Sequence, residues 1–288
     1  MLKRISFVLL TLLLASCNMP GSPTFTPPSS SDTPSPATVF PTTGPEQPTA
    51  TLAETGPALE AIVILQPGPN SAVTSPVTVQ GQSRPTFEQN LVIAVYGEDG
   101  SLLNQQPTTL DSPMGEPGNY SIDITFALVS EQPGRISVFE TSAMDGGIIH
   151  LSSVEVTLLP GGAADIMEPA LGLESIDIQF PEPQAEISGG VIQVSGFSDY
   201  YFESNLGLIL CGEGGSGAPH DLCGTEDNIL ASGNAMIDAP EVGQPGPFNG
   251  ELTYSVFEQT NARIVVFAAS PRDGGWLHIN SIPILLLP

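Results

Sequence analysis

The chain has 288 residues, with 31 Asp and Glu against 6 Lys and Arg, and a formal net charge of −25. Such a field repels phosphate backbones and anionic head groups, so the composition argues against nucleic-acid binding. It would attract divalent cations or basic partners, although acidity can also serve only to keep a protein in solution.

The first 17 residues resemble a bacterial export signal. Lys3 and Arg4 precede an uncharged apolar run, residues 5–15, which is shorter than the about 20 residues that span a bilayer but fits a signal peptide. The sequence Leu-Ala-Ser-Cys at 14–17 then resembles the lipobox of bacterial lipoproteins. That resemblance implies a signal peptide at 1–16, cleavage before Cys17 and fatty acylation of Cys17. The chain would then be extracytoplasmic and anchored to the lipid bilayer of a bacterial membrane.

Two alternatives to the lipobox stay open. One is an ordinary secretory signal that has a cysteine near its cleavage site. The other is an uncleaved anchor helix, which Pro20 and Gly21 disfavour because they end the apolar run.

Residues 17–58 follow and are rich in Pro, Thr and Ser, with few large apolar side chains. They cannot bury enough surface to fold, and we expect a disordered stalk.

The remainder of the chain repeats itself. Residues 77–81 match 192–196 and residues 87–91 match 202–206, both 115 positions apart. Later, 145–147 match 273–275 and His150 matches His278, both 128 apart. Two constant offsets that differ by 13 indicate a duplicated domain with one insertion. We expect a first domain at 59–160, a linker at 161–173 and a second domain at 174–288.

Each copy has the pattern of an all-β domain. Tyr120, Ile122 and Ile124 alternate with polar residues, as in a half-buried strand, and residues 91–95 do the same. Asp99-Gly100 is typical of a hairpin turn between two strands. Several short strands in about 100 residues, without a helical stripe, predict a β-sandwich.

The insertion of 13 residues falls between Leu206 and Gly246, at the position of the Asp99-Gly100 turn of the first copy. It contains Cys211 and Cys223, the two cysteines that remain once Cys17 carries lipid. Disulfides persist outside the cytoplasm, so we expect these two to pair across the enlarged hairpin. Two unrelated thiols are the alternative.

Several motifs recur in order: an opening Ile-x-x-Pro segment at 64–73, a Val-x-Gly strand end, Phe-Glu-x-Asn-Leu, and a late Asp-Gly turn. Together they resemble the immunoglobulin-like domain of bacterial spore-germination proteins. The resemblance covers both copies and implies two tandem immunoglobulin-like β-sandwiches. It implies no reaction, because such domains are usually accessory modules.

The recurring motif residues invite a catalytic reading that we do not favour. We expect Glu88 and Glu203 to accept backbone N–H bonds at a strand entry, with Phe87 and Phe202 in the core. Asn90 and Asn205 would adopt a turn-like backbone. Asp145 and Asp273 would bond their own backbone in Asp-Gly-Gly turns.

The histidines give no metal or catalytic site by sequence. We expect His150 and His278 each to lie alone in its own sandwich in a structural role, and His220, beside Asp221 in the insertion, offers at most a weak metal contact. Calcium at the loop tips stays open without an Asp-x-Asp ladder to support it. We therefore predict no enzyme activity and no required cofactor.

Three functions remain. The first is a binding or adhesion module for an envelope glycan or protein, with the insertion and Trp276, the only tryptophan, as contact candidates. The second is a structural spacer in a surface assembly. The third is a calcium-stabilised or weakly hydrolytic accessory protein.

Overall fold

The structure is a computed structural model that describes residues 58–288, apart from 170–171 and 242. The predicted signal peptide, Cys17 and all of the predicted stalk except residue 58 lie outside the described residues. Within the described part, no helix is long and apolar enough to cross a membrane.

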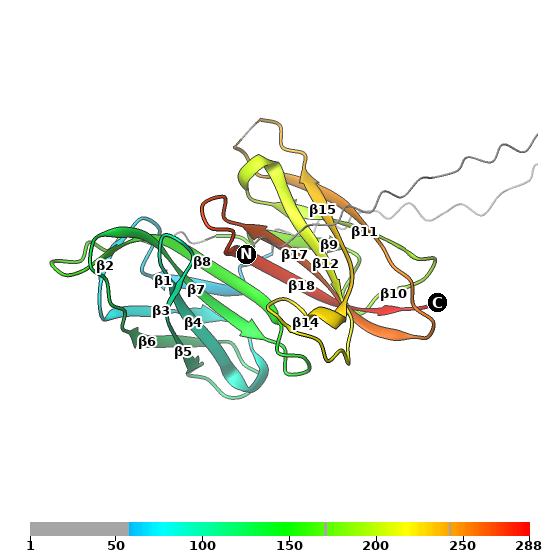
Figure 1. Ribbon diagram of the computed structural model, residues 1–288, viewed down its shortest axis with the longest axis horizontal. Helices are drawn as coiled ribbons and strands as arrows, with labels where there is room; N and C mark the ends of the chain where they lie inside the picture. The colour runs from blue at the N-terminus through cyan, green and yellow to red at the C-terminus, as the bar shows by residue number, and fades with distance from the viewer. Residues whose placement is uncertain (1–57, 170–171, 242) are drawn as a thin grey trace, which may run out of the picture. The chain divides into compact units, whose positions relative to one another are not determined.

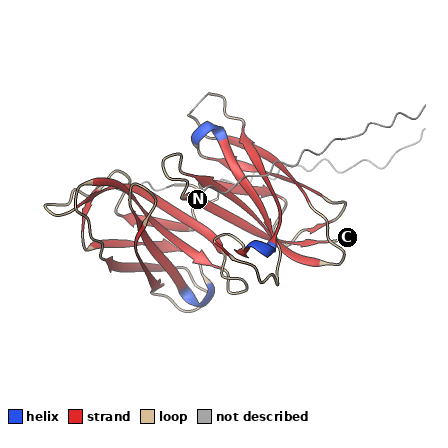
Figure 2. Cartoon of the chain, viewed as in Figure 1, coloured by secondary structure: helices blue, strands red, loops and turns tan. Residues whose placement is uncertain are grey.

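The first repeat forms two facing sheets (Figures 1 and 2). One sheet has the order β1-β3-β6, and the other contains β5-β4-β7-β8, with β2 paired in parallel to β8. The elements are β1 (Ile62–Gln66), β2 (Ala72–Thr74), β3 (Val77–Ser83), η1 (Phe87–Gln89), β4 (Asn90–Tyr96), β5 (Leu102–Thr109), β6 (Gly118–Ile124), β7 (Gln132–Thr141) and β8 (Ile148–Leu159).

The second repeat has the same strands in the same order, and its insertion adds two strands and a 3-10 turn. Strands β13 and β14 and the turn η3 lie inside the hairpin between β12 and β15. The elements are β9 (Ile176–Phe180), β10 (Glu186–Ile187), β11 (Val191–Ser198), η2 (Phe202–Ser204), β12 (Asn205–Cys211), β13 (Pro219–His220), β14 (Gly224–Thr225), η3 (Glu226–Asn228), β15 (Ile229–Ile237), β16 (Gly246–Thr253), β17 (Thr260–Ala269) and β18 (Trp276–Leu286).

Alternating apolar residues build a separate core inside each sandwich. Leu91, Ile93 and Val95 of β4 are buried together with Tyr120 and Ile124 of β6, as their alternation predicts. The second core is assembled in the same way from β9, β11, β12, β15, β16, β17 and β18. The all-β sandwich fold is therefore confirmed, and Asp99-Gly100 forms the predicted hairpin turn between β4 and β5.

The two repeats also share one sheet. Strands β8 and β18 lie side by side and pair antiparallel, so the strand order runs continuously from β5 to β9 (Figure 1). A third apolar cluster covers this joint sheet on the faces of β4, β7 and β8 and of β12, β17 and β18; it includes Phe139, Leu151, Leu222, Val265 and Ile279. Strand β7 is consequently buried on both faces over Gly134–Glu140.

The Phe-Glu-x-Asn-Leu motif has a different role from the predicted one. Phe87 and Phe202 are more than half exposed, and Leu91 and Leu206 occupy the cores instead. Glu88 (φ 52°) and Glu203 (φ 56°), each with the residue after it, have a left-handed backbone. The motif is therefore a tight left-handed turn, closed by the N–H of Asn90 or Asn205 on the carbonyl of Phe87 or Phe202.

The two other expectations about this motif were also wrong. Asn90 and Asn205 are extended, since each already begins a strand. The Phe87 N–H donates to Glu140 Oε1 at 3.1 Å, so Glu140 and not Glu88 receives this strand-entry bond. The tight left-handed turn leaves the Glu88 and Glu203 side chains exposed to solvent.

Candidate functional site

The contact surface between the two repeats is centred on the pairing of β8 with β18 and is called the seam below. It has approximate two-fold symmetry. Leu151 of β8 pairs with Ile279 of β18, and these residues lie 128 positions apart, the offset that relates equivalent residues of the two copies. In an isologous contact, equivalent residues meet at the axis and every other contact occurs twice. The axis therefore passes close to the Leu151–Ile279 pair.

Two ion pairs follow this symmetry. Arg135 of β7 donates from Nη1 to both carboxylate oxygens of Asp273 at 3.1 Å, and both side chains are at most 1% exposed. The equivalent Arg263 lies 3.7 Å from Asp145, with side chains 12% and 10% exposed. Each aspartate also accepts a bond from the second glycine of its own turn, as predicted.

Two serine contacts repeat in the same way. Ser153 Oγ donates to the carbonyl of Leu277 at 2.7 Å, and Ser281 Oγ donates to the carbonyl of Ile149 at 2.6 Å. Both pairs of equivalents are 128 apart. These polar residues recur in both copies because each closes the seam against the other copy.

A cluster of two histidines and two glutamates lies at this seam. His150 Nε2 is 2.8 Å from Glu60 Oε1, and His278 Nε2 is 2.7 Å from Glu174 Oε1. The two imidazole rings meet edge to face with centroids 5.2 Å apart. The side chains are buried, with exposed fractions between 0% and 11%.

Each glutamate is held by the opposite repeat through its second oxygen. Glu60 Oε2 accepts the backbone N–H of Ser175 at 3.4 Å, and Glu174 Oε2 accepts that of Ala61 at 3.2 Å. Glu60 Oε1 also accepts Ser152 Oγ at 2.8 Å. Each glutamate thus bonds a histidine of its own repeat with one oxygen and the backbone of the other repeat with the second oxygen.

The charges of the cluster are mutually stabilising. Burial would raise the pKa of Glu60, but the bond from His150 and the charges of both histidines outweigh it and lower this pKa to about 2. Burial likewise opposes the charged form of His278, yet its bond to Glu174 and the nearby carboxylates raise the pKa of His278.

The prediction that His150 and His278 lie alone was wrong. Each occupies an equivalent place in its own copy, but that place is next to the two-fold axis, so the two meet. Among the described residues, Glu60, His150, Glu174 and His278 are the group with donor atoms close enough to hold a metal ion. Sequence reasoning did not single out Glu60 or Glu174, although they too are equivalent residues, 114 positions apart.

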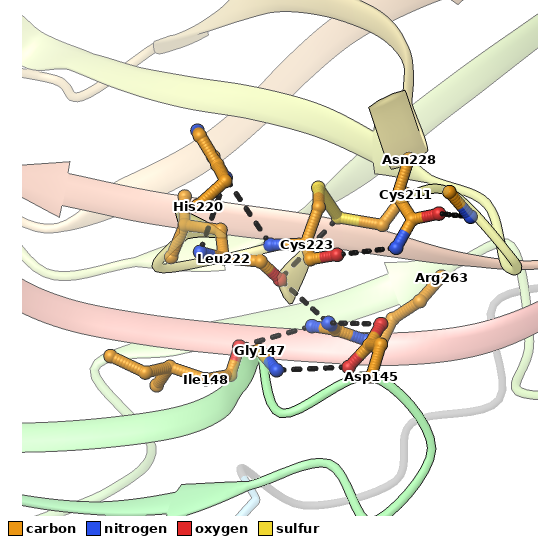
Figure 3. Close-up of a disulfide and its surroundings, with 10 residues drawn as sticks. Asp145, Gly147, Ile148, Cys211, His220, Leu222, Cys223, Asn228 and Arg263 are labelled. Carbon is orange, nitrogen blue, oxygen red and sulfur yellow. Dashed lines mark hydrogen bonds and ion pairs between the residues drawn. A yellow bond between two sulfur atoms is a disulfide. The ribbon is translucent and has the colours of Figure 1, made fainter. Parts of the chain in front are cut away.

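The insertion carries the predicted disulfide. Cys211 at the end of β12 is bonded to Cys223, and both are buried (Figure 3). Leu222, the residue before Cys223, is buried in the shared apolar cluster together with residues of the first repeat. Its carbonyl accepts a bond from Arg263 Nη2 at 2.6 Å, while Arg263 Nη1 donates to the carbonyl of Ile148 at 3.0 Å (Figure 3). The loop is therefore packed onto the first repeat.

The other predicted contact residues lie around this loop. Nδ1 of His220 accepts the N–H groups of Leu222 and Cys223, both at 3.3 Å, which gives it a role in shaping the loop. The Asp221 carbonyl accepts the Ile148 N–H at 2.7 Å. Trp276 packs edge-on against Phe267, and its indole N–H lies 3.4 Å from Asp221 Oδ2.

Two open clefts reach the His–Glu cluster. One, of about 880 Å³, includes Glu60, Glu174 and Asn280 in its lining. The second, of about 630 Å³, includes Glu60, Ser152 and His278. The cluster therefore borders two solvent-open clefts.

The comparisons with known proteins bear on the first repeat. Residues 61–147 match the family model described as the immunoglobulin-like domain of bacterial spore germination. Residues 61–147 thus form an immunoglobulin-like domain of this type. The chain accordingly contains a β-sandwich module of the kind used for binding or structural roles. No curated protein matches the chain.

Solved structures share only a distant likeness. Dimeric latent PorU from Porphyromonas gingivalis is 9% identical, with 80% of this chain and 24% of that one covered and a TM-score of 0.23. Titin domains Z1Z2 in complex with telethonin are 10% identical, with 80% and 97% covered and a TM-score of 0.18. The Ig1-2 module of Drosophila receptor protein tyrosine phosphatase DLAR is 11% identical, with 80% and 100% covered and a TM-score of 0.19. The chain spans about a quarter of the PorU structure, and nothing about function follows from these likenesses.

Proposed function

We propose that this chain is a membrane-anchored lipoprotein of the cell envelope that presents two immunoglobulin-like domains as one rigid, non-catalytic binding module. Its partner would be an envelope glycan or a protein. The lipobox-like sequence ending at Cys17 supports the anchor, and the Pro/Thr/Ser-rich segment supports a stalk between membrane and domains.

The contacts at the seam are the observation that supports one rigid module rather than two flexibly linked domains. Flexibly linked domains need no continuous sheet between them, yet β8 and β18 pair directly here. They also need no charge buried against the neighbouring domain, yet Arg135 and Asp273 are buried as a pair. Separating the domains would expose both charges and the third apolar cluster.

Rigidity is tested by calorimetry of the full chain purified in mild detergent. One body predicts a single unfolding transition for both domains, and a substitution at the seam should move all of it. Two transitions, with only one displaced by the substitution, would disprove the rigid module.

Anchoring and binding need separate experiments. Metabolic labelling with a fatty acid should label the wild-type chain and leave Cys17→Ser unlabelled; equal labelling would refute the anchor. Glycan arrays and pull-downs from solubilised envelope should then reveal a partner. Loss of that partner with Trp276→Ala but not with Val129→Ala, at an exposed residue, would place the binding surface beside the insertion.

An absence of any partner would favour the second candidate, a structural spacer. The same seam supports this reading, because a rigid body also transmits length. Deleting the gene and restoring it with seam-disrupted variants would then alter envelope architecture without altering any binding.

A further inference from the structure

We propose that Glu60, His150, Glu174 and His278 bind one divalent transition-metal ion of the zinc class between the two repeats. The proposal does not depend on the lipid anchor or on a binding partner. It rests on donor spacing, on the orientation of the carboxylates, on charge balance and on access.

The donor spacing fits a four-coordinate ion. One donor atom from each of the four side chains lies within 4.8 Å of the other three. A tetrahedral site with bonds of about 2.0–2.1 Å places its donors about 3.3 Å apart. The distances from Nε2 to Oε1 of 2.7, 2.8 and 3.9 Å lie on either side of that value.

The two carboxylates are already oriented for one bond each. In both, Oε1 faces a histidine while Oε2 is occupied by a backbone N–H of the opposite repeat, from Ser175 for Glu60 and from Ala61 for Glu174. Hydrogen bonds of this kind fix the orientation of metal ligands. Glu60 Oε1 itself also accepts Ser152 Oγ at 2.8 Å and the Ile62 N–H at 3.3 Å, which hold this oxygen toward the cluster.

The charge balance suits one divalent cation. A bound ion displaces any proton from the two ring nitrogens that ligate it. The two neutral imidazoles and two carboxylates then carry a net charge of −2, which a single divalent ion neutralises inside a site that is almost fully buried. Imidazole nitrogen suits zinc, copper and nickel, whereas calcium requires six to eight oxygen donors. Two nitrogens and two carboxylates therefore favour zinc over calcium.

The site has a route of entry and a mechanical consequence. Glu60 and His278 line an open cleft, which is the side from which an ion would enter. Two of the ligands come from segments that precede β1 and β9, and two come from β8 and β18. A bound ion would join both repeats at the axis and stabilise the seam directly.

The test uses the full chain in mild detergent, stripped with a chelator and dialysed against Zn²⁺. We expect one zinc per chain by elemental analysis and a rise in Tm of about 5–10 °C when free Zn²⁺ is 100-fold above its Kd. Ca²⁺ should give no such rise. Co²⁺ should give the intense visible bands of a tetrahedral site.

Matched variants locate the ion. Glu174→Gln and His278→Asn should each weaken zinc binding at least tenfold, with near-ultraviolet circular dichroism checking the fold. Glu203→Gln and His220→Gln, which alter a glutamate and a histidine outside the cluster, should keep one zinc per chain. The cobalt spectrum of the wild type needs no variant and covers the case in which a cluster variant fails to fold.

Three results would overturn the proposal: no zinc in the wild-type chain, zinc retained by both cluster variants, or the pale spectrum of six-coordinate cobalt. The cluster would then be a pair of buried His–Glu ion pairs. None of these results bears on acylation or partner binding, so the two proposals fail independently.

Discussion

Replacing Asp273 by Asn tests the seam most directly, since the chain contains its own control at Asp145. The change keeps the shape of the side chain and an oxygen that can accept the Gly275 N–H. It removes the charge opposite Arg135, which is 1% exposed. Breaking a buried ion pair by removing one partner costs about 3–5 kcal/mol because the other charge stays buried.

The equivalent change, Asp145→Asn, should cost far less. The Arg263–Asp145 distance is 3.7 Å and both side chains are about a tenth exposed. Arg263 also donates to two carbonyls, those of Ile148 and Leu222, which remain in the variant. We expect about 1 kcal/mol here.

Urea unfolding of the full chain, followed by tryptophan fluorescence and circular dichroism, measures both variants. A difference of 2–4 kcal/mol between them corresponds to roughly 5–15 °C in Tm for a protein of this size. Equal costs, within 0.5 kcal/mol, would refute the claim that burial of the Arg135–Asp273 pair distinguishes the two ends of the seam.

Three further predictions concern the pH dependence, the disulfide and a strand glycine. Burial opposes the charge of Asp273, but the Gly275 N–H and Arg135 outweigh it and lower the pKa of this carboxyl. The stabilisation by the charged carboxylate is therefore present above about pH 4 and lost as the pH falls. In acid titrations, the difference in stability between wild type and Asp273→Asn should close. Replacing Cys211 and Cys223 together by Ala should cost about 3 kcal/mol in urea unfolding, as expected for a loop closed over a sequence separation of 12; no loss would show that packing alone holds the loop. Gly196→Ala would drive its Cβ into the Asp177 carbonyl and should cost over ~2 kcal/mol in urea unfolding. Gly161→Ala, with no atom within 4 Å of the new Cβ, should change stability by less than ~0.5 kcal/mol.

Local patterns were enough to predict much of the fold. Alternation along β4 and β6 identified their buried faces, and Asp99-Gly100 located a hairpin. The step between the two repeat offsets located the insertion and led to the Cys211–Cys223 pair. These features depend on neighbours within one strand or hairpin, so the sequence carries them directly.

The His–Glu cluster was missed because it depends on how the two copies meet. A period of two shows which face of a strand is buried, but it does not show that the outer face of β7 is covered by a second copy. The signal was present in the repeat itself. Arg135 and Arg263, like His150 and His278, are equivalent polar residues, and their recurrence on strands suited to burial indicates a polar contact on a two-fold axis.

The motif around Phe87 was misread for a local reason. An aromatic residue before a strand was expected to point inward, but the left-handed backbone at Glu88 and Gln89 reverses the direction of the chain after it. Positive φ at non-glycine residues is uncommon and costs conformational energy, so it has no simple sequence signature. The same geometry at Glu203 and Ser204 shows that the motif encodes this turn in both copies.

The asymmetry of the insertion becomes intelligible once the seam is seen as two-fold. In each copy, the hairpin that follows β4 or β12 packs against the Asp-Gly-Gly turn of the other copy, at 273–275 or 145–147. A glycine with positive φ makes each contact: Gly100 lies against Asp273, and Gly224 lies against Asp145. A homodimer of one copy would need identical turns at both ends. Joining the copies in one chain removes that requirement. One end of the seam therefore keeps the short Asp99-Gly100 turn, which lies over the buried Arg135–Asp273 pair.

At the other end, the disulfide-bridged loop covers a longer and more exposed ion pair, with Leu222 in the shared cluster. The second repeat thus departs from the first where it faces its partner copy, while Glu60, His150 and their equivalents at the axis are retained. The two glutamates and two histidines of the cluster are the same in both copies, and so are the residues of the two Arg–Asp pairs. Leu151 and Ile279 on the axis differ, and so do Ser152 and Asn280 beside them. The charged residues and histidines of the seam are therefore kept in both copies, while the loop at one end and some uncharged positions at the axis have diverged.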